Sequence, residues 1–148
     1  MKFRFLLTAL LLALVLPAVA ATSDLNEVRI SKIERYVYGD EQSGAVSARL
    51  NQLEEDMFGR STAKDDVEKI TYLHDFIFKD SGENPSLDMK LSFLEWKLFN
   101  KTGQGNLEAR LAELDKQVIG SVSFEPLAFR LEQRVHLTIE NGLISLHR

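Results

Sequence analysis

A unit of about twenty residues recurs six times along this chain, and this repetition limits the fold more than any other feature of the sequence. Residues 30–59 align without a gap to residues 91–120. The matches at this offset of 61 residues include Glu34 with Glu95, Arg49 with Arg110, Leu50 with Leu111, and Gly59 with Gly120. The shorter unit occurs three times in each half, with one extra residue between the third and fourth copies. Repetition on this scale is typical of stacked helical units that bury a shared core.

Four apolar positions define each copy. The first is aliphatic throughout: Ile30, Leu50, Ile70, Leu91, Leu111 and Leu131. The second, three residues later, holds Ile33, Leu53, Leu73, Leu94, Leu114 and then Arg134. The third, four residues further on, holds Val37, Met57, Ile77, Leu98, Val118 and then Thr138. The fourth follows at once with Tyr38, Phe58, Phe78, Phe99, Ile119 and Ile139. Steps of three and four place these side chains on one face of a helix, so each copy predicts one short amphipathic helix.

The ends of these helices are marked as well. The predicted units span about 25–39, 45–59, 65–79, 86–100, 106–120 and 126–140. Gly39, Gly59 and Gly120 directly follow the fourth apolar position, where helices commonly end in left-handed geometry. Links of about six residues favour antiparallel neighbours. We therefore expect an all-α fold of about six short antiparallel amphipathic helices in a solenoid-like array, with a closed bundle as the alternative.

The last copy departs from this pattern. Arg134 and Thr138 interrupt the apolar stripe, and residues 135–139 alternate between apolar and polar side chains. The Asn-Gly pair at 141–142, a favoured hairpin turn, then precedes an apolar stretch at 143–146. These features predict a C-terminal β-hairpin, and the alternative is that the sixth helix continues.

The first twenty residues have the composition of a secretory signal peptide. Lys2 and Arg4 precede an apolar run from Leu6 to Leu16, and residues 18–20 offer the small-x-small pattern that signal peptidase cleaves. The run is shorter than the roughly twenty residues that span a bilayer. We expect residues 1–20 to be removed and residues 21–148 to form a single helical-repeat domain. That domain would be periplasmic, associated with the cell surface, or secreted, in a bacterium.

The composition limits the partners of such a domain. The whole chain carries 18 Lys and Arg against 22 Asp and Glu, and removal of residues 1–20 takes away two basic residues, giving a net charge of 16 − 22 = −6. An acidic chain of this kind is not expected to bind nucleic acid or anionic membranes in general. No stretch after residue 20 has the length and composition of a transmembrane segment. The chain has no Cys, so packing without disulfides must hold the exported domain.

A basic residue stands directly before the first apolar position in every copy: Arg29, Arg49, Lys69, Lys90, Arg110 and Arg130. Five residues after each of them stand Glu34, Glu54, His74, Glu95, Asp115 and Val135. Five residues correspond to about 140° around a helix, so the two positions flank the apolar stripe and pair poorly within one helix. We expect the basic side chains to pair with the acidic flank of a neighbouring helix. The alternative is that they bind an anionic envelope partner.

Other side chains with chemical potential are few. Four aromatic residues on the third and fourth helices fall off the main stripe: Tyr72, Phe76, Phe93 and Trp96. They predict either helices buried on two sides or an apolar patch that recruits a partner. His74, His136 and His147 lack the spacing of metal ligands, and the chain has no nucleophile or phosphate-loop motif. We therefore expect no cofactor, no metal and no enzymatic activity.

Two stretches, Ile33–Gly39 and Arg49–Gly59, resemble tandem short helical repeats of exported bacterial proteins, which carry a Leu-Glu-x-x-apolar-aromatic-Gly signature. The resemblance covers residues 28–120 and brings no activity or functional residue with it. It implies an exported bacterial envelope protein. Together with the lack of a catalytic motif, it predicts a non-enzymatic structural or protein-interaction module. The alternatives are an envelope module that binds polyanions or lipids through the basic residues and, third, an enzyme of unknown type.

Overall fold

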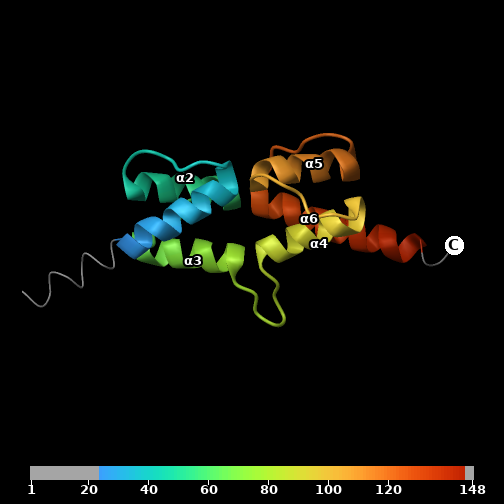
Figure 1. Ribbon diagram of the computed structural model, residues 1–148, viewed down its shortest axis with the longest axis horizontal. Coiled ribbons are helices and arrows are strands. Elements are labelled where there is room, and N and C mark those ends of the chain that lie inside the picture. Colours follow the sequence, from blue (N-terminus) through green and yellow to red (C-terminus); the bar gives the residue numbers. More distant parts are fainter. Residues whose placement is uncertain (1–23, 146–148) are drawn as a thin grey trace, which may run out of the picture.

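The computed structural model of this protein describes residues 24–145, and this part of the chain consists of six helices without a β-strand (Figure 1). The first helix spans residues 24–38. The others are α2 (Val46–Phe58), α3 (Asp66–Phe78), α4 (Leu87–Phe99), α5 (Leu107–Ile119) and α6 (Leu127–Ser145). The prediction of an all-α fold is confirmed for these residues. The predicted signal peptide and His147 lie outside them.

The local sequence explains where these helices begin and end. The side chains of Asp65, Ser86 and Asn106 cap the next helix by accepting hydrogen bonds from backbone N–H groups three residues later. At the other end, Gly59 and Gly120 adopt left-handed geometry (φ 72° and 80°) and close α2 and α5. The sequence thus marks the starts of α3, α4 and α5 and the ends of α2 and α5.

Neighbouring helices run parallel to each other, which overturns the prediction of antiparallel neighbours. Arg49, near the start of α2, contacts both Glu27 and Glu34 of the first helix. Arg110 occupies the same place in α5, and it contacts Asp88 near the start of α4. The links after the first helix, α2, α4 and α5 run back along the preceding helix (Figure 1). Each of these links has seven residues, which span about 23 Å when extended. A thirteen-residue helix is about 20 Å long, so such a link can return the chain to the starting level.

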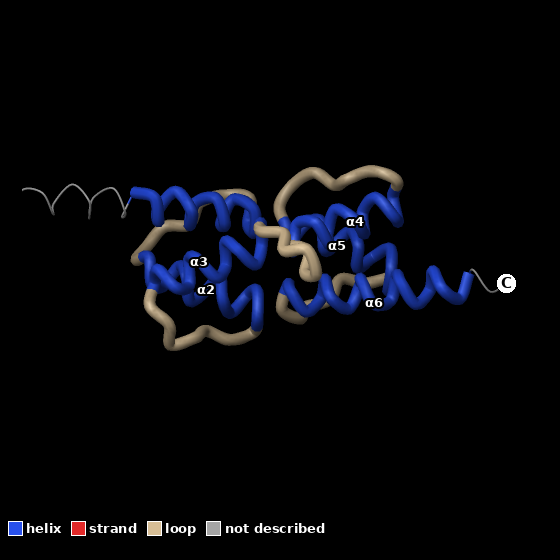
Figure 2. The backbone as a smooth tube through the Cα atoms, turned by 90° about the horizontal axis from the view of Figure 1, so that it is seen from below, coloured by secondary structure: helices blue, strands red, loops and turns tan. Residues whose placement is uncertain are grey.

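The six helices form two tiers of three parallel helices that lie end to end along the long axis (Figure 2). The first tier contains the first helix, α2 and α3, and the second contains α4, α5 and α6. The first helix ends at α5, where the Asn106 side chain donates a hydrogen bond to the Tyr38 carbonyl oxygen (2.6 Å). The α2 helix ends at α6, and a Cβ at Gly59 would lie 2.9 Å from the Pro126 ring. The α3 helix ends at α4.

The link between the tiers differs from the other links. After α3 the chain does not run back but forms a tight turn, in which Ser81 and Asn84 exchange two backbone hydrogen bonds. The chain thereby passes from the end of α3 directly to the start of α4, and the extra residue of the repeat falls in this turn. Helices distant in sequence, such as α2 and α6, are in contact. The fold is therefore neither a closed six-helix bundle nor an array in which helices contact only sequence neighbours.

The core follows the apolar positions of the repeat. Every residue at the first position is buried, and so is every residue at the second, including Arg134. The fourth position is half-buried in the first four copies, but Ile119 and Ile139 are exposed. The second tier meets the ends of the first-tier helices, and within residues 24–145 no third tier follows α4, α5 and α6.

The C-terminal β-hairpin is absent from the described residues, because residues 127–145 form the single helix α6. In this helix Leu131, Arg134, Val135 and Thr138 recur at steps of three and four on the inward side. Asp115 binds both Arg130 and Arg134, and these contacts support helical spacing rather than strand alternation. Among residues 24–145, no helix is both long enough and apolar enough to cross a membrane.

Candidate functional site

The basic residues of the repeat form a series of buried ion pairs between consecutive helices. Four pairs share a separation of fifteen residues: Arg49 with Glu34 (2.7 Å), Lys69 with Glu54 (2.9 Å), Arg110 with Glu95 (2.7 Å) and Arg130 with Asp115 (2.7 Å). All four carboxylates are buried. In each pair the basic residue near the start of one helix contacts the acidic residue of the helix before it. The two partners stand five residues apart in the repeat, which in parallel helices is an offset of about 7.5 Å along the axis, and the long basic side chain bridges it.

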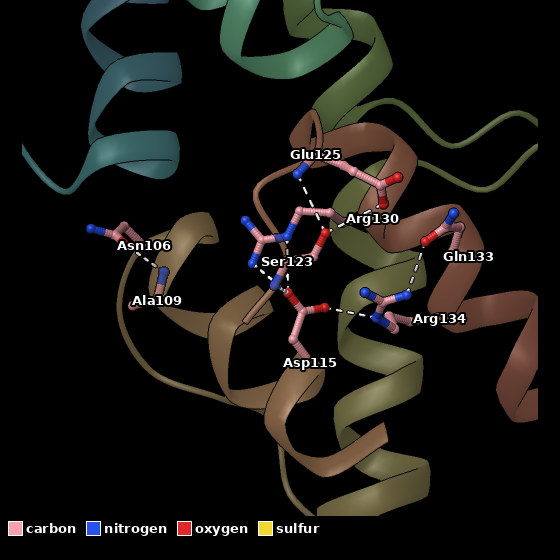
Figure 3. Close-up of polar contacts among 8 residues, drawn as sticks. All are labelled: Asn106, Ala109, Asp115, Ser123, Glu125, Arg130, Gln133 and Arg134. Atoms are coloured by element: carbon pink, nitrogen blue, oxygen red, sulfur yellow. Dashed lines mark hydrogen bonds and ion pairs between the residues drawn. The ribbon is translucent and has the colours of Figure 1, made fainter. Parts of the chain in front are cut away.

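Each of these carboxylates also binds the link that follows its own helix. The acceptors Glu34, Glu54, Glu95 and Asp115 take backbone N–H hydrogen bonds from Gln42, Thr62, Gly103 and Ser123, eight residues later. Figure 3 shows this arrangement at Asp115, where Ser123, Arg130 and Arg134 converge on one carboxylate. At Glu95 the approach is so close that a Cβ at Gly103 would lie 2.2 Å from a carboxylate oxygen. The carboxylate therefore ties each returning link to its helix.

The two copies without an acidic residue at this position are the two that lack a returning link. His74 stands at the end of the first tier, before the tight turn, and Val135 stands in the last helix. The first helix of each tier has no helix before it in that tier, so its basic residue has no buried carboxylate fifteen residues earlier to pair with. Arg29 is exposed and forms no ion pair within the described residues, and Lys90 pairs with Glu132 of α6 instead.

The environment of the pairs favours their charged forms. Burial opposes ionisation of Asp115, but hydrogen bonds from Ser123, Arg134 and Arg130 outweigh it and lower the pKa of this carboxyl below its ordinary value. Glu54 has a lowered pKa for the same reasons, with hydrogen bonds from Thr62 and Lys69. In return, the hydrogen bond to Glu95 raises the pKa of Arg110. These groups are engaged with one another, so the arrangement holds helices and links together.

The four aromatic residues singled out from the sequence do not form one patch. Tyr72 and Phe76 stack on each other (6.1 Å between ring centroids), and both contact Phe58 of α2. Phe93 and Trp96 lie on α4, are exposed, and contact no other aromatic ring in the described part of the chain. The first pair thus belongs to the packing of α2 against α3, and the second faces solvent.

A groove of about 360 Å³ lies at the junction of the two tiers, and sequence analysis did not anticipate it. Its walls come from the ends of the first helix and α2, the starts of α5 and α6, and the link between α5 and α6. Four acidic residues line it: Glu55, Asp56, Glu108 and Glu125. None of these carboxylates forms an ion pair within residues 24–145, and the one cationic residue of the lining, Arg130, is bound to Asp115. The groove therefore carries uncompensated negative charge.

Two aromatic residues complete the groove. The Tyr38 hydroxyl donates a hydrogen bond to Asp56 (2.7 Å), and burial together with this bond raises the pKa of Tyr38. Phe124, in the link before α6, is 99% exposed. No signal in the sequence identifies this site, because Glu55 and Glu108 belong to different copies. Only the end-to-end stacking of the tiers brings them to one groove.

No group of three or more His, Asp or Glu side chains among the described residues is placed to hold a metal ion. His74 lies beside Asp75 (3.4 Å between Nδ1 and Oδ1), and His136 lies beside Glu140 (3.0 Å). Comparison of the chain with protein-family models, curated proteins and solved structures gave no match.

Proposed function

We propose that this chain is a non-enzymatic protein-interaction module of the bacterial cell envelope, and that it binds a basic segment of a partner protein in the groove between its tiers. The observation that carries this proposal is the set of four groove carboxylates without a cationic partner within the described residues. Lys or Arg side chains of a partner would compensate this charge. Exposed ion pairs alone contribute little binding energy, and the exposed Phe124 ring would add an apolar contact with the partner.

Export is part of the proposal and rests on the first twenty residues. Their short basic start, apolar run and small-residue cleavage pattern support a removable signal peptide. A domain without Cys is also indifferent to the oxidising conditions outside the cytoplasm. The likeness to tandem repeats of exported bacterial proteins points to the same compartment.

The rival proposal, that the basic residues of the repeat bind a polyanion, has less support. Four of those six residues are committed to buried carboxylates, and Lys90 is bound to Glu132. A polyanion would have to break these pairs, which carries a large penalty for each carboxylate left buried. Arg29 is the exposed member of the set, and one exposed cation gives little affinity.

The groove is tested by calorimetric titration of residues 21–148 with a short synthetic peptide of alternating Lys and Leu. The same peptide with Glu in place of Lys serves as the ligand control. We expect the basic peptide to bind and the acidic one not to. Substitution of both Glu55→Gln and Glu108→Gln should weaken binding by about tenfold, the value of two partly exposed charge pairs.

Two further variants sharpen this test. Phe124→Ser should weaken binding of the basic peptide without altering its dependence on salt, because Phe124 contributes an uncharged contact. Glu68→Gln with Glu113→Gln removes two exposed carboxylates outside the groove lining and should leave affinity unchanged. If the groove variant and this control lose the same amount of affinity for the peptide, binding depends on the net charge of the protein. That result would refute the groove as the binding site.

A further inference from the structure

The outer face of α4 is apolar although it faces solvent. Met89, Phe93 and Trp96 follow one another at steps of four and three residues, on the side opposite to the buried Leu91 and Leu94. Their exposed fractions are 50%, 48% and 58%. This helix therefore presents one apolar face to the core and a second one to solvent, and the described residues leave the second face uncovered.

The charges around this outer face are basic. Lys97 follows Trp96 on α4, and Lys101 stands in the link just after this helix; both are exposed and form no ion pair within the described residues. Both acidic residues of α4 are engaged elsewhere. Asp88 accepts a hydrogen bond from the Tyr36 hydroxyl and pairs with Arg110, and Glu95 is buried against the same arginine. The apolar face is thus flanked by free lysines and by no free carboxylate of its own helix.

This combination is specific to α4 and is not a consequence of the repeat. The equivalent helix of the first tier, 61 residues earlier, carries Val28, Lys32 and Arg35 at the same three positions. There Lys32 lies over the Phe78 ring, at 3.9 Å from its centroid. The first helix thus carries two basic side chains on this face, whereas α4 carries the exposed aromatic residues Phe93 and Trp96.

We propose that the outer face of α4 docks on an anionic phospholipid surface. Trp and Phe side chains are favoured at the level of the lipid headgroups, and flanking lysines are attracted to anionic lipids. The net negative charge of the whole chain opposes such binding in general, so a face whose helix carries a free lysine and no free carboxylate is the one that meets the membrane. None of the residues lining the acidic groove belongs to α4, so the groove stays open to a protein partner when α4 is docked.

The single tryptophan of the chain makes this proposal directly measurable, because Trp96 lies on the proposed surface. Residues 21–148, which include every described helix and contact, are mixed with vesicles of phosphatidylcholine alone or with added phosphatidylglycerol. Far-ultraviolet circular dichroism first establishes that this segment and its variants are folded. We expect Trp96 emission to shift to shorter wavelength with the anionic vesicles, and brominated lipid to quench it.

Three variants decide between surface docking and other causes. Phe93→Gln and, separately, Lys97→Glu with Lys101→Glu should each lower the partition coefficient by roughly tenfold. Phe129→Gln, an equally exposed aromatic on α6, is the matched control and should leave it unchanged. An unshifted Trp96 spectrum at saturating anionic lipid, or partitioning that Phe93→Gln does not alter, would overturn the proposal. Peptide binding in the groove is measured without lipid, so that failure would leave the proposed protein-binding function intact.

Discussion

At the scale of single residues, Thr138 is the clearest departure from the packing that the repeat prescribes. It occupies the third apolar position, where other copies have Val, Met, Ile or Leu. Only 8% of Thr138 is exposed, and its hydroxyl has no hydrogen-bond partner among the residues that the structure describes. A buried hydroxyl without a partner costs about 1–3 kcal/mol. Thr138 therefore makes the folded protein less stable than an apolar residue at this position would.

We predict that Thr138→Val raises the free energy of unfolding by about 1 kcal/mol, because the methyl group fills the same space without a polar atom. Chemical denaturation of residues 21–148 and the variant measures the difference. Val37→Thr places a hydroxyl at the equivalent buried site of the first copy and should lower stability by a similar amount. A loss of stability in Thr138→Val would mean that the hydroxyl is satisfied in solution.

At the scale of helices and links, the sequence determined the helices but not their direction. Apolar steps of three and four describe a face equally well in either direction. A link of seven residues can either turn sharply or run back the length of a helix. The acidic residues of the repeat do distinguish a link that runs back from one that turns sharply. They are missing in the third and sixth copies, at His74 and Val135, where no link returns. The groove had no such signal, since its walls depend on how the two tiers stack.

The best test of the returning links is Asp115, which holds the link before α6 and two arginines. We predict that Asp115→Asn lowers the free energy of unfolding by about 3 kcal/mol, because Arg130 and Arg134 would remain buried without a full countercharge. Glu113→Gln, an exposed change on the same helix, should cost less than about 0.5 kcal/mol. Denaturant titration measures both. Equal effects would mean that Asp115 does not anchor the link.

The pKa of Asp115 adds a dependence on pH. It is lowered in the folded state, so its stabilisation is present above the ordinary carboxyl pKa and is lost as pH falls through the folded value. The native chain should therefore lose stability below about pH 4, and Asp115→Asn should lose less over the same range.

At the scale of the whole molecule, the two tiers depend on each other because each is small. A half of about sixty residues buries too little apolar surface for more than marginal stability. The junction supplies what is missing at the first tier. There Asn106 donates a hydrogen bond to the Tyr38 carbonyl oxygen, and the Pro126 ring lies against Gly59.

We predict that residues 21–83 alone have a lower helix content and melting temperature than residues 21–148, because the ends of their helices lose these contacts. Residues 84–148, added in equal amount, should restore the helical signal at 222 nm, since Asn106 and Pro126 still meet Tyr38 and Gly59. Asn106→Ala in the added half should weaken this recovery, and Glu113→Gln should not. If residues 21–83 melt at the temperature of residues 21–148, the tiers are independent and the groove between them lacks a fixed shape.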